Sequence, residues 1–242
     1  RGLELIVDIP DDLPPLVSIQ SHRPGLLRGL DADGRVVVVA CADTPWVACP
    51  TLPEPVVQLT DYGGLTADGV LVPDVNHDLT LDAPAGPWVV LADSHPAGVD
   101  TARRLWVHGA PDLTVDLPVA PTAIVADVHR DRAGACVLDG QGTIHCAGTA
   151  PFTGWATDPP YRALVGSLGA ACALKNASTL VCNDGTVHDF GPVLAFSVAR
   201  YPYYAADGSF VERYDAPVTV CALPEDGGIV CEGPRTDGLS LD

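Results

Sequence analysis

The chain has 242 residues, of which 47% are hydrophobic, and a formal net charge of −18 at pH 7. This length and apolar content suit one large all-β domain or two small ones, with a core that forms without help from metals. The negative charge disfavours nucleic acid and anionic membrane surfaces as partners, and no apolar run reaches the roughly 20 residues that span a bilayer.

The first element of the chain is a short string of the form Leu-x-x-Asp-x-Pro, and this string recurs. The copies are residues 5–10, 79–84 and 113–118, and the chain ends on residues 239–242 as if another copy began there. Short apolar strands are expected at residues 16–19, 56–59, 124–125 and 164–165 and at Leu194. The match between the first and last strings suggests that the terminal strands join to close a ring.

Two hairpins are predicted in the first third of the chain, at residues 30–36 and 65–71. Each has a three-residue loop that ends in glycine, Gly34 or Gly69, because the last position of such a loop favours the left-handed backbone region. Residues 31–34 also resemble a fragment of a calcium loop, but a full loop needs more oxygen ligands, so we interpret them as a turn. A further hairpin with a longer loop is expected between residues 89–91 and 104–107.

The eight cysteines form four local pairs. These are Cys41 and Cys49, Cys136 and Cys146, Cys172 and Cys182, and Cys221 and Cys231. In the last three pairs the second cysteine lies ten positions after the first. A hairpin with a three-residue loop places these cysteines opposite each other, within disulfide reach, and places Leu138 opposite Ile144. The last loop positions are then Gly142, Ser178 and Gly227, of which Ser178 is the least suited to a left-handed conformation.

Metal ligation is the alternative reading of the cysteines. Zinc sites favour close pairs such as Cys-x-x-Cys, and the sequence has none. We therefore predict four disulfides, each worth roughly 2–3 kcal/mol for a short closed loop. Disulfides persist in oxidising compartments, so we expect an extracytoplasmic location: secreted, periplasmic or at a cell surface.

The hairpins belong to a larger repeat. Both faces of each cysteine hairpin are mostly apolar, which is typical of a hairpin packed between neighbours. The repeating unit is an inner strand, a hairpin and an outer strand, with a period of roughly 30–45 residues. Six such units fill the chain, and this pattern predicts a β-propeller.

The strings of the form Cys-Ala-Leu…Gly…Ile-Val-Cys resemble the regulator of chromosome condensation repeat, in particular its bacterial extracytoplasmic version with a cysteine pair flanking the hairpin. The resemblance is best over residues 120–242, weaker over 14–75 and weakest over 76–118. It implies an all-β propeller, and family members usually have seven blades. We count six, with seven as the alternative, in a single domain over residues 1–242.

No known catalytic motif is present, and the seven histidines have no metal-ligand spacing. We therefore assign no catalytic residue, no metal ligand and no cofactor, and we interpret His145 as a packed structural histidine. Residues 200–214 form an extra stretch in the last unit and hold four of the six tyrosines. Tyrosine-rich loops on rigid scaffolds are common at binding surfaces. The candidate binding residues are Tyr201, Tyr203, Tyr204 and Tyr214, with Trp155 and Tyr161 as a second group.

These patterns favour a non-enzymatic binding module, secreted or displayed on a cell surface, that recognises a protein or belongs to an extracellular assembly. One alternative is a lectin-like propeller with a glycan partner, which should show repeated aromatic pockets. The other is a hydrolase or lyase with its active site at the channel mouth, which should show clustered carboxylates or histidines there. The expected partner is a protein, with no nucleic acid and no membrane insertion.

Overall fold

A computed structural model gives the architecture of the chain. It describes residues 16–23, 26–41, 52, 55–60, 62–73, 86–92, 95–110, 112–129, 132–148, 160–167, 169–199, 203–204, 210–211, 218–225, 229–232 and 240–241. Within these ranges the regular structure consists of strands in antiparallel sheets, which confirms the all-β prediction. None of the residues in these ranges forms a helix long and apolar enough to cross a membrane.

Six sheets of three or four strands follow one another along the described parts of the chain, and we number them as blades 1 to 6. Blade 1 consists of β1 (Leu16–Arg23), β2 (Leu26–Asp31) and β3 (Val36–Cys41). Blade 2 consists of β4 (Gln58–Thr60), β5 (Gly63–Leu65) and β6 (Leu71–Pro73). Blade 3 consists of β7 (Trp88–Leu91), β8 (Ala97–Asp100) and β9 (Leu105–Val107). Blade 4 consists of β10 (Pro121–His129), β11 (Arg132–Asp139) and β12 (Ile144–Gly148). Blade 5 consists of β13 (Ala163–Ser167), β14 (Ala170–Leu174), β15 (Thr179–Cys182) and β16 (Val187–Asp189). Blade 6 is β17 (Val193–Ala199), β20 (Thr219–Pro224), β21 (Ile229–Glu232) and β22 (Ser240–Leu241), and a separate two-stranded sheet, β18 (Tyr203–Tyr204) and β19 (Phe210–Val211), is inserted between β17 and β20.

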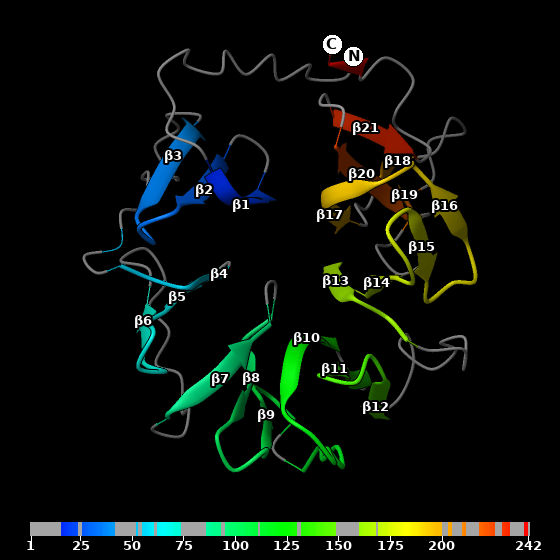
Figure 1. Ribbon diagram of the computed structural model, residues 1–242. Helices are drawn as coiled ribbons and strands as arrows, with labels where there is room; N and C mark the ends of the chain where they lie inside the picture. The colour runs from blue at the N-terminus through cyan, green and yellow to red at the C-terminus, as the bar shows by residue number, and fades with distance from the viewer. Residues whose placement is uncertain are drawn as a thin grey trace.

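The blades are arranged around a common axis, with the first strand of each blade innermost (Figure 1). Neighbouring inner strands contact each other: β7 with β10, β10 with β13, and β13 with β17. The inner strand β1 of blade 1 also contacts β17 of blade 6. This is the arrangement of a β-propeller.

Apolar clusters fill the seams between neighbouring blades, as the two apolar faces of the hairpins predict. Val90 and Val99 of blade 3 pack with Ile124 and Val137 of blade 4. Corresponding clusters lie between blades 4 and 5 and between blades 5 and 6. The cores are therefore distributed between neighbouring blades, which stabilise each other where these clusters lie.

The predicted hairpin register is confirmed. Cys136 lies opposite Cys146 and Leu138 opposite Ile144, and the hairpins at residues 30–36 and 65–71 have the same register. In blade 3, however, the sequence-based hairpin was wrong, because it joined the segments of β7 and β9. Strand β8 lies between them, and its Gly98 packs so closely on Trp88 that a Cβ there would lie 2.8 Å from the ring.

Three of the hairpin turns share one hydrogen-bonding scheme. The Oδ1 atom of Asp139 accepts backbone N–H groups two and four positions further on, at 2.9 Å each. Asp31 and Asp100 do the same in blades 1 and 3. Asp31 thus stabilises the hairpin turn, in agreement with the interpretation of residues 31–34 as a turn. Gly34, Gly69 and Gly142 have φ values of +76°, +78° and +82°.

Ser178 departs from this expectation. Among the described residues other than glycine, positive φ occurs at Arg103 and not at Ser178. In the blade 5 turn the side-chain oxygen of Asn176 instead accepts the backbone N–H groups of Ser178 and Thr179, at 2.8 Å each. This side chain closes the turn without a left-handed residue.

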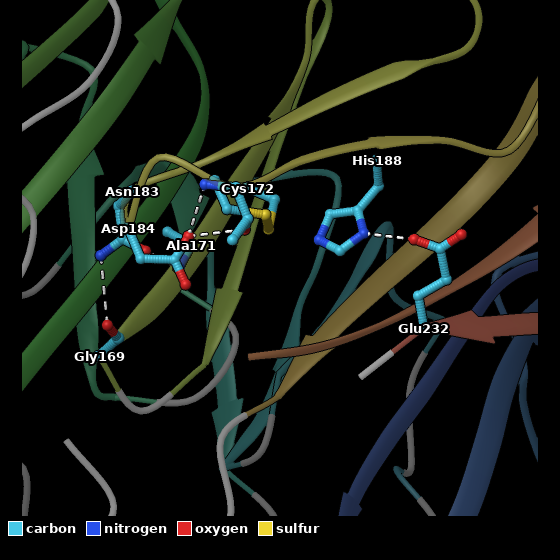
Figure 2. Close-up of a disulfide and its surroundings, with 9 residues drawn as sticks. Gly169, Ala171, Cys172, Asn183, Asp184, His188 and Glu232 are labelled. Atoms are coloured by element: carbon cyan, nitrogen blue, oxygen red, sulfur yellow. Dashed lines mark hydrogen bonds and ion pairs between the residues drawn. A yellow bond between two sulfur atoms is a disulfide. The ribbon is translucent and has the colours of Figure 1, made fainter. Parts of the chain in front are cut away.

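Two predicted disulfides are present, Cys136–Cys146 and Cys172–Cys182. Figure 2 shows the second of these with its surroundings. Cys221 is disulfide-bonded and lies opposite Cys231 in the register, as predicted. Cys49 lies outside the described residues, so the prediction for Cys41 and Cys49 is not tested.

The recurring outer element is partly described. Residues 113–117 alternate between inward and outward positions but form no strand, and Leu113, Val115 and Leu117 pack against the core between blades 3 and 4. The C-terminal copy contains β22, which pairs with β21 as the outermost strand of blade 6. The copies at residues 5–10 and 79–84 lie outside the described residues.

Candidate binding surface at the channel mouth

The innermost strands of blades 1, 3, 4 and 6 begin with a β-bulge. In blade 3, Trp88 pairs with Asp100 and Val90 with Val99, which leaves Val89 unpaired. Thr122 and Leu194 are skipped in the same way in blades 4 and 6. A bulge re-aims a side chain that regular alternation would place elsewhere.

Blades 2 and 5 have an equivalent residue just before the inner strand. The N–H groups of Val57 and Arg162 each donate a hydrogen bond of 2.7 Å to the second strand of their own blade. We call Val57, Val89, Thr122, Arg162 and Leu194 the mouth ring. Val17 holds the corresponding position in blade 1, but its side chain lies outside the described residues.

The mouth ring lies on the same face as the hairpin tips. The residue just before each ring position donates its N–H to the hairpin tip of the preceding blade: Val56 to Gly34, Trp88 to Gly69, Tyr161 to Gly142, and Val193 to Ala177, at 2.8–2.9 Å. In blade 3 the tip residue Arg103 uses its guanidinium instead, which donates to the carbonyl oxygens of Leu117 and Pro118. These contacts fix the start of each inner strand against the neighbouring blade.

The mouth ring exposes aliphatic side chains. Val57, Val89 and Leu194 are 63%, 41% and 66% exposed, and they are three of the six large hydrophobic residues that are exposed in the described part of the chain. Exposed apolar side chains gathered at one place mark interaction sites more often than singly scattered ones do. The repeated bulge therefore singles out this face as the candidate binding surface.

A cavity of about 320 Å³ opens beside the ring. Its lining joins residues of four blades: Val57, Gln58, Leu65, Val89, Val90, Thr122, Ala123, Ile124 and Leu164. The Gln58 side chain fixes one wall, because its Nε2 donates to the carbonyl oxygen of Leu91 at 2.6 Å and its Oε1 accepts the Leu91 N–H at 3.0 Å. Most of its lining residues are aliphatic, but the surface that they present to the cavity is more polar than apolar.

Two of the described histidines are held by carboxylates. His145 Nε2 lies 2.8 Å from Asp139 Oδ2, a contact that suits the predicted structural role. His188 of blade 5 bonds Glu232 of blade 6 through Nδ1 at 2.6 Å, across the seam (Figure 2). Among the residues that the structure describes, no three metal-ligating side chains lie close enough together to hold a metal ion.

Burial and hydrogen bonds oppose each other at two hairpin carboxylates. Burial raises the pKa of Asp139, but hydrogen bonds from His145 and from the backbone of Thr143 and Gln141 outweigh it and lower the pKa. At Asp100, burial likewise raises the pKa, and hydrogen bonds from Arg104 bring the pKa below its usual value. Both carboxylates therefore stay charged and hold their turns.

Of the predicted binding residues, the structure describes Tyr161 and the backbone of Tyr203 and Tyr204. Tyr161 is 4% exposed and packs in the core between blades 4 and 5, so it is not a surface aromatic. Tyr203 and Tyr204 form β18, which follows the end of β17 opposite Leu194; their side chains are not described. Trp155, Tyr201 and Tyr214 lie outside the described residues.

Sequence reasoning missed the mouth ring. The available signal was a pair of consecutive hydrophobic residues at the start of an inner strand, as in Val56 and Val57 or Val193 and Leu194. Such a pair breaks the alternation of a half-buried strand and indicates a bulge.

No protein-family model matches the chain, and no curated protein sequence matches it. Among solved structures it is similar to the WD40 domain of SCAP from fission yeast, with 7% identity and a TM-score of 0.33, over 88% of this chain and 43% of that chain. It is also similar to BBS1N in complex with ARL6DN, with 13% identity and a TM-score of 0.33, over 94% of this chain and 81% of that chain. The chain thus spans less than half the length of the first of these structures.

Proposed function

We propose that the chain is a non-enzymatic protein-binding module and that the mouth ring is its contact surface. The observation that carries the proposal is the exposure of aliphatic side chains at equivalent positions, at the start of the inner strand, in three blades: Val57, Val89 and Leu194. A bulge locally disrupts the ladder of backbone hydrogen bonds. An exposed aliphatic side chain adds no hydrophobic stabilisation to the free protein. A partner that covers the ring would bury these side chains, and this burial would stabilise the complex.

The setting of the module follows from its cysteines. The disulfides Cys136–Cys146 and Cys172–Cys182 suit an oxidising compartment, so we place the protein outside the cytoplasm, secreted or at a cell surface, as part of an extracellular assembly. The shared cysteine register supports membership of the extracytoplasmic regulator of chromosome condensation repeat type. We propose a single domain over residues 1–242.

A second contact region is supported by the insertion in blade 6. Strands β18 and β19 form a small sheet of their own, inserted in the chain between β17 and β20. Tyrosines combine apolar area with a hydrogen-bonding group, which suits them to protein interfaces. We therefore keep Tyr201, Tyr203, Tyr204 and Tyr214, together with Trp155, as proposed contact residues.

A capture experiment tests the role of the mouth ring. Immobilised protein is exposed to the secreted and surface proteins of the source organism, and bound proteins are quantified by mass spectrometry. A triple variant with Val57→Ser, Val89→Ser and Leu194→Ser should lose partners that the wild type retains.

The matched control replaces three exposed valines outside the ring by serine: Val70, Val187 and Val230, which are 56%, 62% and 45% exposed. This control should retain the partners, and both triple variants should unfold at the wild-type temperature because the replaced side chains are exposed. If the ring variant retains every partner, the mouth ring is not the contact surface.

A further inference from the structure

We propose that the mouth ring recognises an acidic segment of a partner protein, with an Asp or Glu carboxylate on Arg162 and a neighbouring aliphatic side chain in the cavity. This inference rests on the proposed function and adds the chemistry of the partner. It follows from the charge of the ring, from the surroundings of Arg162 and from the position of the cavity.

The mouth ring differs in charge from the rest of the chain. The chain has 31 acidic and 13 basic residues, yet the described ring positions hold one arginine and no carboxylate. The other members are Val57, Val89, Thr122 and Leu194, all uncharged and exposed. The hairpin tips on the same face carry the exposed carboxylates Asp33 and Asp68, in blades 1 and 2. The ring itself carries none, so its own charge is compatible with an acidic segment.

Arg162 is exposed and makes no side-chain hydrogen bond or ion pair with any residue that the structure describes. The flanking hairpin tips, residues 139–143 and 175–179, hold a single carboxylate, Asp139, which is buried and bonded to His145. They also hold the amine of Lys175. The guanidinium is thus ready to bind a carboxylate through two parallel hydrogen bonds.

Asp189 is the next carboxylate along blade 5. It lies opposite Thr179 on β16, the outermost strand, whereas Arg162 precedes the innermost strand. Three strand spacings separate these positions, about 14 Å at roughly 4.8 Å per spacing. The Asp189 carboxylate also accepts the N–H of Gly191. It therefore does not neutralise Arg162.

The cavity lies beside Arg162 along the same strand. Leu164, two residues after Arg162, lines the cavity together with Val89 and Thr122 of the two preceding blades. An extended segment with a carboxylate on Arg162 would then place its next side chain at the cavity, whose lining residues are mostly aliphatic. Burial of one aliphatic side chain there would add to the charge contact and fix the direction of the segment.

The test uses three fluorescein-labelled peptides, each acetylated and amidated, with a leucine–glutamate–leucine centre between glycine and serine residues. In the second peptide glutamine replaces the glutamate, and in the third lysine replaces it. Binding to the whole chain is measured by fluorescence anisotropy at 0.15 M salt. The wild type should bind the glutamate peptide about tenfold more tightly than the glutamine peptide, the factor expected for one charge-assisted pair.

Arg162→Gln should abolish this tenfold preference. The matched control is Arg35→Gln, because Arg35 is an exposed arginine at the hairpin tip of blade 1, on the same face, where it is paired with Asp33 at 3.3 Å. That variant should keep the preference. If the three peptides bind equally well, or if Arg35→Gln weakens binding as much as Arg162→Gln, the acidic preference is refuted.

The capture experiment separates this inference from the proposed function. If the triple ring variant loses its partners and Arg162→Gln keeps them, the mouth ring binds proteins but does not select acidic segments. If both lose the same partners, Arg162 belongs to the contact surface, and the peptide series decides whether this surface selects acidic segments. If the triple ring variant keeps its partners, the proposed function itself fails.

Discussion

The carbonyl oxygen of Gly69 accepts a hydrogen bond of 2.8 Å from the backbone N–H of Trp88, across the seam between blades 2 and 3. A Cβ on Gly69 would lie 2.6 Å from the carbonyl oxygen of Trp88. The φ of Gly69 is +78°, in the left-handed region that L side chains avoid. Glycine is therefore required at this position both by the turn and by the approach of the next blade.

Gly69→Ala should lower the free energy of unfolding by roughly 2–4 kcal/mol, because left-handed strain of about 1 kcal/mol adds to a backbone overlap that only a shift of the blades can relieve. Gly185→Ala is the control, since Gly185 has a φ of +87° but nothing within 4 Å of the added Cβ. It should cost only the strain of about 1 kcal/mol. Urea unfolding measures both values, and equal losses would show that the seam adapts without cost.

The hairpins could be predicted because their signals are local. Loop length and the glycine position set the register, so Cys136 opposite Cys146 follows from the spacing alone. The same logic fails at Ser178, because a side chain, Asn176, closes that turn. It fails in blade 3 because Ala97–Asp100 contains a glycine and a single β-branched residue and so lacks the pattern of a strand.

The candidate site could not be predicted in the same way. Exposure of Val57, Val89 and Leu194 depends on how each inner strand begins, with a bulge at Val89 and Leu194, and on how the blades pack, which are properties of the assembled structure. Tyr161 was expected at the surface because it lies in a loop region. Its N–H donates a hydrogen bond to the carbonyl oxygen of Gly142 in the preceding blade, and its side chain is buried in the core. Long-range packing decided both cases.

The stability contribution of Asp139 should vanish in acid. Its pKa is lowered in the folded protein, because the hydrogen bonds from His145 and the turn outweigh the effect of burial. A lowered pKa means that the stabilisation is complete above the unfolded pKa of about 3.9 and is lost as the pH falls through the folded value. The difference in unfolding free energy between the wild type and Asp139→Asn should therefore be constant near neutral pH and shrink below about pH 4. A difference that stays constant down to pH 2 would contradict this assignment.

His95 should make the protein less stable in mild acid. Burial lowers the pKa of His95, and the hydrogen bond from its Nε2 to the carbonyl oxygen of His108 and the charge of Asp127 offset this only in part. Because the folded state favours neutral His95, stability should fall as the pH drops below the unfolded pKa of about 6.5. His95→Gln should show a smaller loss between pH 7.5 and 5.5 in thermal unfolding. Parallel curves for the two proteins would mean that His95 does not titrate differently on folding.

The two described disulfides should differ in their resistance to reduction. Cys146 is exposed, so a thiolate can approach the Cys136–Cys146 bridge, whereas Cys172 and Cys182 are 0% and 1% exposed. Exchange requires attack on a sulfur atom, and burial blocks that attack until the blade opens. Dithiothreitol under native conditions should therefore open Cys136–Cys146 first.

Timed quenching with iodoacetamide, followed by full reduction, a second alkylating label and peptide mapping, gives the order of reduction. The same map without reduction tests the predicted bridges from Cys41 to Cys49 and from Cys221 to Cys231. In urea above the unfolding midpoint the order should disappear, because the bridges are then equally accessible. Early loss of Cys172–Cys182 in the native protein would mean that blade 5 opens locally, at a lower free energy than the burial of its inner strands implies.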